Sequence, residues 1–416
     1  MAEAAIIQPA ELDRLRRRTV ATLVAGVALG STGHIAAVTV ATIVATHISG
    51  GTTAWSGVPS ATVVLGAAAG ASALSWLMVR RGRRTGLATG YVVSVMGALV
   101  ATVAIVAMSL PLLLIGTVLI GFGNASNQLS RYTAADLAPP DRRASAIGVV
   151  VWGATVGAVI GPNLAAPAGQ VALALGLPEL AGPYLVPIVF VGAAALLSFT
   201  MLRPDPYELA DASSRHDTTD RNVAVSLASV LARPSVPLAI VALVAGQFVM
   251  VLIMTMTPLH MAAHGHDLTA VGVVISGHTF GMFGLSPISG RLTDRYGSVA
   301  VILAGLAVVA MASVLAAVAP PDGGVVLFLA LFLLGYGWNL GYVAGSALLT
   351  HGLTLAERTK VQGLADTLIW SSAAVASLGS GIVLAYAGYA ILGLMGAALV
   401  VVPMLLVYAR RSVASV

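Results

Sequence analysis

Twelve apolar stretches, each long enough to cross a lipid bilayer as a helix, constrain this chain more than any other feature. A helix needs about 20 apolar residues to cross the hydrocarbon layer. The stretches are expected at 19–45, 53–79, 85–108, 111–134, 144–171 and 183–202 in the first half, and at 235–261, 268–290, 298–319, 324–350, 358–387 and 389–409 in the second. Only 9% of the residues are charged, against about a quarter in a soluble domain. The sequence therefore predicts an all-α integral membrane protein with twelve transmembrane helices.

The basic residues predict the orientation of these helices. All 21 Lys and Arg residues fall on one side of a twelve-span topology, before the first span, in the loops after the even-numbered spans, or after the last span. Arg131, Arg142 and Arg143 are assigned to the turn between the fourth and fifth spans. Cytoplasmic loops carry an excess of Lys and Arg. We therefore expect cytoplasmic N- and C-termini, and the net charge of +5 reflects this orientation rather than nucleic-acid binding.

The membrane is expected to be a bacterial plasma (inner) membrane. A single lysine, Lys360, stands against twenty arginines, and Ala, Gly and Val are abundant. This composition is typical of a GC-rich bacterial genome.

An internal repeat divides the spans into two halves. Three features recur at a spacing of 215 or 216 residues: Arg80-Arg81-Gly82 and Arg295-Tyr296-Gly297, Asn124 and Asn339, and Asp141-Arg142 and Glu357-Arg358. Parallel repeats related by an axis along the membrane normal occur in secondary transporters. We expect two pseudo-symmetric six-helix bundles, residues 1–202 and 234–416, joined by a polar cytoplasmic linker at 203–233.

The loop after the eighth span carries the charged motif Gly290-Arg-Leu-Thr-Asp294-Arg295-Tyr-Gly297. In this motif the chain resembles the major facilitator superfamily, and the resemblance covers its whole length. It implies the fold of that family, transport by alternating access, and a gating role for Gly290, Asp294, Arg295 and Gly297. The alternative is that these arginines only set the topology. The first-half copy has Ser75 and Val79 at the Gly and Asp positions, so we expect a stronger charged lock in the second half.

Methionine and histidine residues in the seventh and eighth spans suggest a metal. Met250 and Met254 lie four residues apart, as do His278 and Met282, so each pair shares one helical face. Thioether sulfur is a soft ligand that selects Cu(I), and imidazole also suits copper. Packing is the alternative for the methionines, because methionine fills gaps in apolar cores. A histidine within the membrane more often marks a pathway.

These two motifs resemble those of the CcoA-like (CalT) copper importers, a branch of the same superfamily in which they are the proposed copper ligands. The resemblance implies that Met250, Met254, His278 and Met282 bind copper as the substrate during import. The same branch includes members thought to import riboflavin, so the resemblance leaves the substrate open.

Other polar residues within the spans are candidates for lining a substrate cavity. They are His34, Asn124, Asn127, Gln128, Gln247, Trp338, Asn339 and Tyr342. Hydrogen bonding between helices is the alternative role for these side chains. Asp366 in the eleventh span is a candidate proton carrier, because a buried carboxylate is costly in its charged form. Its alternative role is to cap a polar group near the cytoplasmic end.

Two transport functions remain open from the sequence: copper import, or proton-coupled transport of a small organic solute such as a riboflavin-like compound or a drug. Gly157-Ala-Val-Ile-Gly161-Pro162 is similar to a motif of drug antiporters, although Thr117 replaces their intramembrane arginine. A non-transporting sensor or assembly factor is a third hypothesis.

Several classes of function are excluded. Neither an enzyme nor an ATP-driven pump is expected, because no catalytic or phosphate-binding motif is present. The absence of cysteine excludes disulfides and thiolate metal sites. We expect no cofactor, a small-molecule or metal-ion substrate, a lipid bilayer as surroundings, and a monomer.

Overall fold

The computed structural model describes residues 9–50, 58–214, 227–266, 268–320 and 324–410, and no β-strand occurs among them. Twelve helical segments of this described part are long and apolar enough to span a membrane. They are Glu11–Ala41, Val58–Arg81, Arg83–Val106, Leu110–Leu137, Pro140–Asn163, Glu179–Met201, Ser235–Met261, Ala270–Tyr296, Ser298–Val318, Gly324–Leu349, Leu355–Ala387 and Tyr389–Ala409. The prediction of an all-α protein with twelve transmembrane helices is therefore confirmed.

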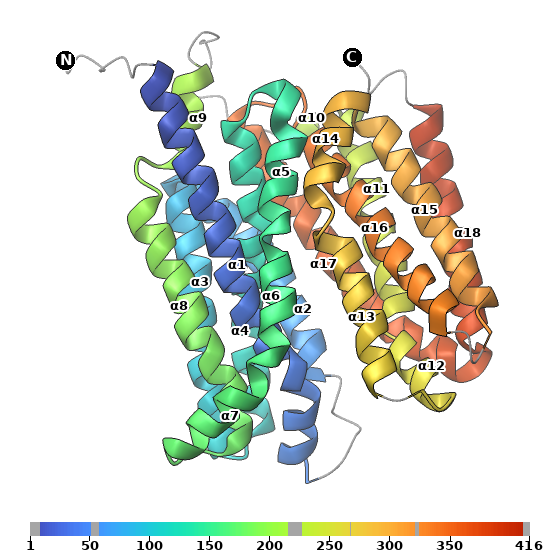
Figure 1. The fold of residues 1–416 in the computed structure, drawn as a ribbon. Coiled ribbons are helices and arrows are strands. Elements are labelled where there is room, and N and C mark those ends of the chain that lie inside the picture. The colour runs from blue at the N-terminus through green and yellow to red at the C-terminus, as the bar shows by residue number, and fades with distance from the viewer. Residues whose placement is uncertain (1–8, 51–57, 215–226, 267, 321–323, 411–416) are drawn as a thin grey trace.

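The helices form two bundles that lie side by side (Figure 1). The first contains α1 (Pro9–Ile48), α2 (Val58–Arg81), α3 (Arg83–Val106), α4 (Leu110–Leu137), α5 (Arg143–Trp152), α6 (Ala154–Asn163), α7 (Ala165–Ala174) and α8 (Gly182–Met201). The second contains α11 (Ser235–Met254), α12 (Thr257–Ala263), α13 (Leu268–Phe283), α14 (Ser286–Tyr296), α15 (Ser298–Val318), α16 (Gly324–Leu349), α17 (Leu355–Ala387) and α18 (Tyr389–Ala409). Short helices α9 (Pro206–Ser214) and α10 (Leu227–Leu231) belong to the predicted linker, of which residues 215–226 lie outside the described part.

Three of the predicted spans are divided into shorter helices. The fifth comprises α5, α6 and α7, the seventh α11 and α12, and the eighth α13 and α14. Proline contributes to these breaks because it has no N–H to donate to the preceding turn. Pro162 lies inside α6, and Pro287 lies in the first turn of α14. The eighth span also continues to Tyr296 rather than ending at residue 290, so Asp294 and Arg295 lie in the last turn of α14 instead of a loop.

The internal repeat is visible in the backbone. Gly82 separates α2 from α3, and Gly297 separates α14 from α15. Both glycines have a φ of +86°, a conformation that side chains with a Cβ rarely adopt. The two repeated motifs therefore make the same tight connection between consecutive helices.

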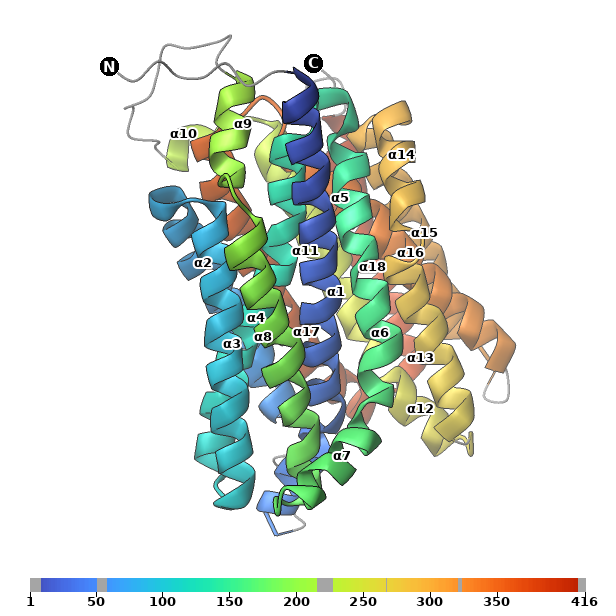
Figure 2. The ribbon, with the colours of Figure 1, turned by 60° about the vertical axis from the view of Figure 1, so that its left-hand side comes forward.

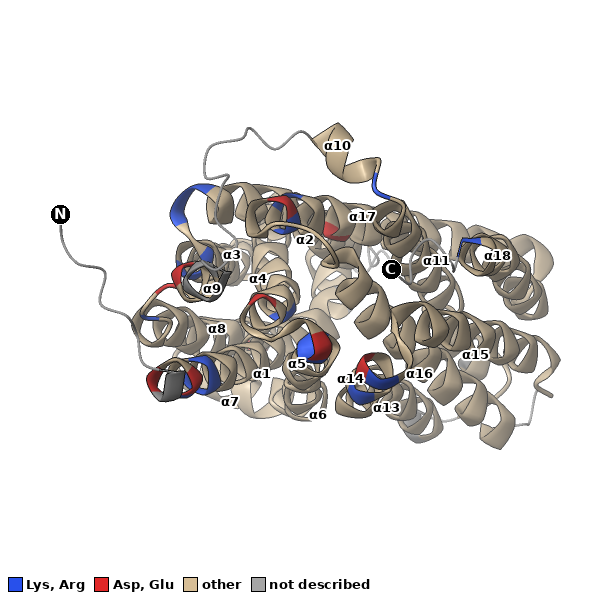
Figure 3. Cartoon of the chain, turned by 90° about the horizontal axis from the view of Figure 1, so that it is seen from above, with Lys and Arg blue, Asp and Glu red and all other residues tan. Residues whose placement is uncertain are grey.

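The main contacts between the two bundles are those of α2 with α17 and of α5 with α14. Helices α5 and α14 lie toward the end of the molecule at which α1 begins and α18 ends (Figure 2). Basic residues are gathered there, and we call it the basic end (Figure 3). Glycine permits the closest approaches between the bundles: a Cβ on Gly290 would lie 2.6 Å from the Ala144 carbonyl oxygen, and one on Gly363 would lie 2.5 Å from the Ser75 Cβ. At the opposite end, α7 and α12 each pack within their own bundle. The structure is thus closed at the basic end.

Candidate functional site

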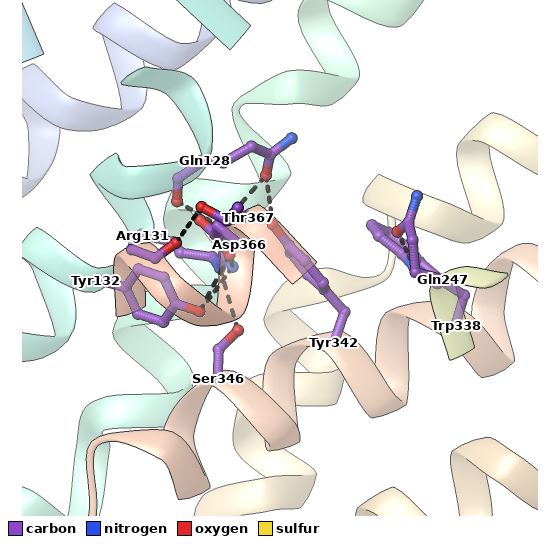
Figure 4. A network of polar contacts seen from close by, with 10 residues as sticks. Gln128, Arg131, Tyr132, Gln247, Trp338, Tyr342, Ser346, Asp366 and Thr367 are labelled. Carbon is purple, nitrogen blue, oxygen red and sulfur yellow. Dashed lines mark hydrogen bonds and ion pairs between the residues drawn. The ribbon is translucent and has the colours of Figure 1, made fainter. Parts of the chain in front are cut away.

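An ion pair is buried between the two bundles (Figure 4). Arg131 on α4 and Asp366 on α17 approach to 2.6 Å between Nη2 and Oδ1, with only 1% and 2% of their side-chain surfaces exposed. A second contact joins Nη1 to Oδ2 at 3.4 Å. Charged groups within membrane helices are costly and usually functional. This pair links helices of different bundles, so a rearrangement of the bundles would change it.

Arg131 is surrounded by partners on all sides. Its Nε donates to Ser346 Oγ (3.1 Å), its Nη1 to the Gln128 carbonyl (2.5 Å), and its Nη2 to the Tyr132 hydroxyl (2.8 Å). The Tyr132 and Tyr342 rings lie 4.1 and 4.3 Å from the guanidinium carbon. Each of its nitrogens is therefore engaged, and the aromatic rings add cation–π stabilisation.

Two aromatic and two amide side chains lie beside this pair, and we call them the aromatic and amide wall: Trp338, Tyr342, Gln128 and Gln247. Trp338 and Tyr342 are one turn apart on α16, and their rings stack with centroids 4.4 Å apart. The Trp338 indole N–H donates to Gln247 Oε1 on α11 (2.8 Å). The Tyr342 hydroxyl donates to Gln128 Oε1 across the boundary between the bundles. The structure thus brings together four of the predicted cavity residues with Asp366.

The remaining cavity candidates of the first bundle lie on α1 and α4. Asn127 accepts a hydrogen bond from the Tyr91 hydroxyl (2.9 Å) and donates to Ser31 Oγ (3.4 Å). His34 and Asn124 lie one helical turn farther from the basic end than Ser31 and Asn127, because α1 and α4 run in opposite directions. The Nδ1 atom of His34 is buried with no hydrogen-bond partner in the described residues.

Asn339 connects helices within the second bundle. Its amide donates to the Met282 carbonyl (2.6 Å) and to Ser286 Oγ (2.7 Å), and its oxygen accepts from Ser289 (2.5 Å). These bonds hold α16 against α13 and α14 and correspond to the alternative, interhelical role considered from the sequence.

The predicted gating residues lie at the closed basic end. Both Asp294 carboxylate oxygens accept backbone N–H groups of the other bundle, from Ala144 (3.1 Å) and Ser145 (2.9 Å). These residues are in the first turn of α5, where N–H groups have no helical partner. Arg295 is exposed and lies over the Tyr296 ring, 5.3 Å from its centroid.

A second charged cluster at the basic end also joins the bundles. Arg83 Nη2 donates to Asp136 Oδ2 (2.6 Å) and to Gln362 Oε1 (2.7 Å). Asp136 also pairs with Arg358 at 3.7 Å. Asp136 belongs to the first bundle, whereas Gln362 and Arg358 belong to α17 of the second. The cluster therefore adds charged contacts across the closed end.

The methionine and histidine motifs lie on helices that pack on either side of α16. Met250 on α11 is buried in the core of the second bundle. Met254 and Met282 are partly buried against that core. His278 on α13 is fully buried, and its Nδ1 lies 2.8 Å from the Leu331 carbonyl of α16. In the described part of the chain, no three His, Asp or Glu side chains are grouped as a metal site.

The assignment of Arg131 to the turn between the fourth and fifth spans was wrong. This residue lies within α4 and is buried against α17. A sequence signal for it did exist, since Asn124, Gln128 and Arg131 are spaced on one face of a helix. Its partner is 235 residues away in the chain, a distance over which spacing gives no information.

The fold is that of a known family. The family model described as Major Facilitator Superfamily matches residues 19–377, with a second match at 238–415. This chain belongs to the major facilitator superfamily. As a major facilitator protein it is a membrane transporter and not an enzyme, and transporters of this superfamily handle small-molecule substrates.

Several major facilitator proteins are similar to this chain. An uncharacterised MFS-type transporter of Bacillus subtilis, YdeG, is 38% identical over 80% of this chain and 78% of its own length. The riboflavin transporter RfnT of Brucella anthropi is 31% identical over 82% of this chain and 84% of its own length. Among solved structures, the outward conformation of FucP, the E. coli fucose:proton symporter, aligns with a TM-score of 0.75 at 17% identity, covering 94% of this chain and 98% of that one.

Proposed function

We propose that this chain is a secondary transporter that moves a small, planar and uncharged organic solute by alternating access. The observation that carries the proposal is the Arg131–Asp366 pair, which joins the bundles beside the aromatic and amide wall. A transporter of this kind binds its solute between two halves that close alternately at either end. The site lies between the bundles, and the basic end is closed.

The wall favours a flat solute with polar edges. Aromatic rings prefer to stack with other rings, and Trp338 and Tyr342, each 5% exposed in this structure, would provide such a partner in a state that admits the solute. The amides of Gln128 and Gln247 each carry both donors and acceptors, which suits a heterocycle with carbonyl and N–H groups. The similarity to a riboflavin transporter supports a solute of this type.

The charges at the site favour an uncharged solute. The positive charge of Arg131 is balanced by Asp366, and each guanidinium nitrogen already has a partner. An anionic solute would have to displace Asp366, which would leave a buried carboxylate without its counter-ion. A neutral ring bound beside the pair requires no such exchange.

Asp366 is the proposed coupling group. A proton on Asp366 would remove the charge that holds Arg131 and weaken the link between α4 and α17. Proton binding and rearrangement of the bundles would then be linked through one contact. We further propose that the basic end faces the cytoplasm of a bacterium, which makes this structure the outward-facing state.

Riboflavin counterflow in proteoliposomes tests the proposal, since exchange does not depend on the direction of net transport. We expect the purified protein to exchange labelled riboflavin, and Trp338→Ala to reduce the exchange at least tenfold by removing the stacking surface. Trp76→Ala is the matched control, because Trp76 is 56% exposed on the outside of α2. If the unmodified protein does not exchange riboflavin, the proposal of a riboflavin-like solute is wrong. If Trp338→Ala and Trp76→Ala lose the same amount of exchange, the proposed role of the wall in binding the solute is wrong.

Copper import through Met250, Met254, His278 and Met282 is the second candidate. One observation favours it: the Leu331 carbonyl can only accept a hydrogen bond, so His278 Nδ1 carries the proton. The Nε2 atom is buried, has no hydrogen-bond partner among the residues that the structure describes, and keeps a lone pair that a metal ion could use. The positions of α11 and α13 on either side of α16 count against a joint site.

Uptake of radioactive copper by cells expressing the chain distinguishes this candidate. Copper import predicts that Met250→Ala and His278→Ala each abolish uptake at unchanged protein levels, whereas Met311→Ala, at an exposed position of α15, does not. Uptake that is the same in all variants would exclude the metal site.

A further inference from the structure

Three arginines surround the basic end of α8 on the outside of the first bundle. Helix α8 lies between α1 and α3. Arg18 on α1 donates from Nη2 to the sulfur of Met201 at 3.5 Å. Arg84 on α3 and Arg203, just after α8, lie over the ring of Phe199 at 5.3 and 5.5 Å. The three guanidinium groups therefore gather around the last turn of one helix, and we call them the α8 arginine cluster.

In the described part of the chain, no carboxylate forms an ion pair with any of the three arginines of this cluster. The carboxylate next to it in sequence, Asp205, accepts the backbone N–H groups of Arg83 (3.0 Å) and Arg84 (3.1 Å). Asp205 thus caps α3 rather than neutralising a guanidinium. By contrast, Arg83 at the same end is fully buried and paired with Asp136.

The surface beside the cluster is apolar and exposed. Phe199 is 51% exposed and Met201 is 39% exposed, in the last turn of a helix that spans the membrane. Side chains of this kind contact acyl chains, whereas arginines at a helix end reach the headgroup layer. Cation and hydrocarbon surfaces are therefore adjacent, as the two parts of a phospholipid are.

We propose that the α8 arginine cluster binds the phosphate headgroup of an anionic phospholipid, with the acyl chains against Phe199 and Met201. Guanidinium groups bind phosphate oxygens through paired, charge-assisted hydrogen bonds. Basic clusters at the membrane surface attract anionic lipids. A bound phosphate also relieves the mutual repulsion of Arg84 and Arg203, which share one ring. The site lies away from the solute site between the bundles and does not depend on the solute.

Native mass spectrometry of the full chain tests this site with cardiolipin and phosphatidylglycerol as probes. We expect lipid adducts on the unmodified protein, and a roughly tenfold or larger loss of affinity in Arg84→Gln/Arg203→Gln. The matched control is Arg291→Gln/Arg410→Gln, two exposed arginines of the second bundle with no ion pair in the described residues. All four positions are at least partly exposed, and a thermal melt of each variant verifies its folding.

A second measurement separates a lipid from a free phosphate. In nanodiscs of phosphatidylethanolamine, added cardiolipin should raise the melting temperature of the unmodified protein but not that of Arg84→Gln/Arg203→Gln, and inorganic phosphate should change neither. Equal lipid binding by the two double variants would overturn the proposal. Stabilisation by inorganic phosphate alone would assign the cluster to a soluble anion and overturn the lipid site.

Discussion

Arg131 and Asp366 each lie inside a membrane-spanning helix, where an isolated charge is unstable. Together they form a neutral pair whose other polar atoms are bonded to Ser346, Gln128 and Tyr132. Breaking a buried ion pair by removing one partner is costly, whereas removing both charges is much less so. The pair is therefore a coupled unit, and its two residues should be changed together as well as singly.

Asp366→Asn is expected to lower the free energy of unfolding by about 3–5 kcal/mol, because Arg131 remains buried without a counter-ion. Arg131→Gln/Asp366→Asn should recover a large part of that loss. The melting temperature of the purified protein in detergent, followed by fluorescence, measures both effects. Asp141→Asn, at an exposed position, serves as control. A double variant no more stable than Asp366→Asn would show that the two charges do not depend on each other.

Several residues of the site were predicted from the sequence, whereas Arg131 and its partners Tyr132 and Ser346 were not. Gln128, Gln247, Trp338 and Tyr342 were predicted to line the cavity because polar or aromatic groups are rare in such apolar spans, and the structure brings them together, although their role in binding a solute stays a prediction. Arg131 was missed because an arginine near a helix end has the same local pattern whether it faces water or a buried carboxylate. Only the three-dimensional contact with Asp366 separates the two cases.

At the level of the helices, the two bundles close the basic end by different means. Helix α17 has its own capping box, in which Glu357 N–H donates to the Thr354 hydroxyl and Thr354 N–H donates to the Glu357 carboxylate. Helix α5 has no side-chain cap of its own and is capped by Asp294 of the other bundle. Val79 matches Asp294 in the repeat, but its side chain has no hydrogen-bond acceptor that could cap α17. Capping of this kind thus joins the bundles on one side, and the charged cluster of Arg83 and Asp136 joins them on the other, so a stronger charged lock in the second half stays a prediction.

Asp294→Ala is expected to destabilise the start of α5 by about 1 kcal/mol, the usual cost of a lost N-cap. Hydrogen exchange at the amides of residues 144–147 should accelerate roughly fivefold, and the closed basic end should open more often. In Thr354→Ala the acceleration should be confined to the first turn of α17. Unchanged exchange in α5 after Asp294→Ala would mean that the cap contributes nothing to closure.

At the scale of the whole molecule, the twelve spans and the internal repeat could be predicted from hydrophobicity and charge. Both properties can be read from short stretches of sequence without knowledge of the three-dimensional contacts. Which end is closed did not follow, because both states of an alternating-access carrier use the same helices. The closed basic end depends on a few contacts between the bundles. Among them are the close approaches of Gly290 to Ala144 and of Gly363 to Ser75, and the hydrogen bond between Ser72 and Thr367. Such contacts are set by three-dimensional packing and leave little trace in composition.

A disulfide across the bundles should hold the molecule in the state described here. The hydroxyl oxygens of Ser72 on α2 and Thr367 on α17 are 2.6 Å apart, and the chain has no cysteine to interfere. Ser72→Cys/Thr367→Cys should crosslink readily on oxidation and lose transport, with recovery on reduction. Each single variant should keep transport under oxidation. Transport by the crosslinked protein would show that the basic end need not open.

The neutrality of the Arg131–Asp366 pair has an electrical consequence. Moving one elementary charge through the membrane potential changes the free energy by about 2.3 kcal/mol per 100 mV. With Asp366 ionised, the site carries no net charge, so the membrane potential does not change the free energy of the rearrangement between the two states. With Asp366 protonated, the site carries one positive charge, and voltage then drives only the protonated form toward the negative side. A single carboxyl group would in this way decide whether the transport cycle generates current.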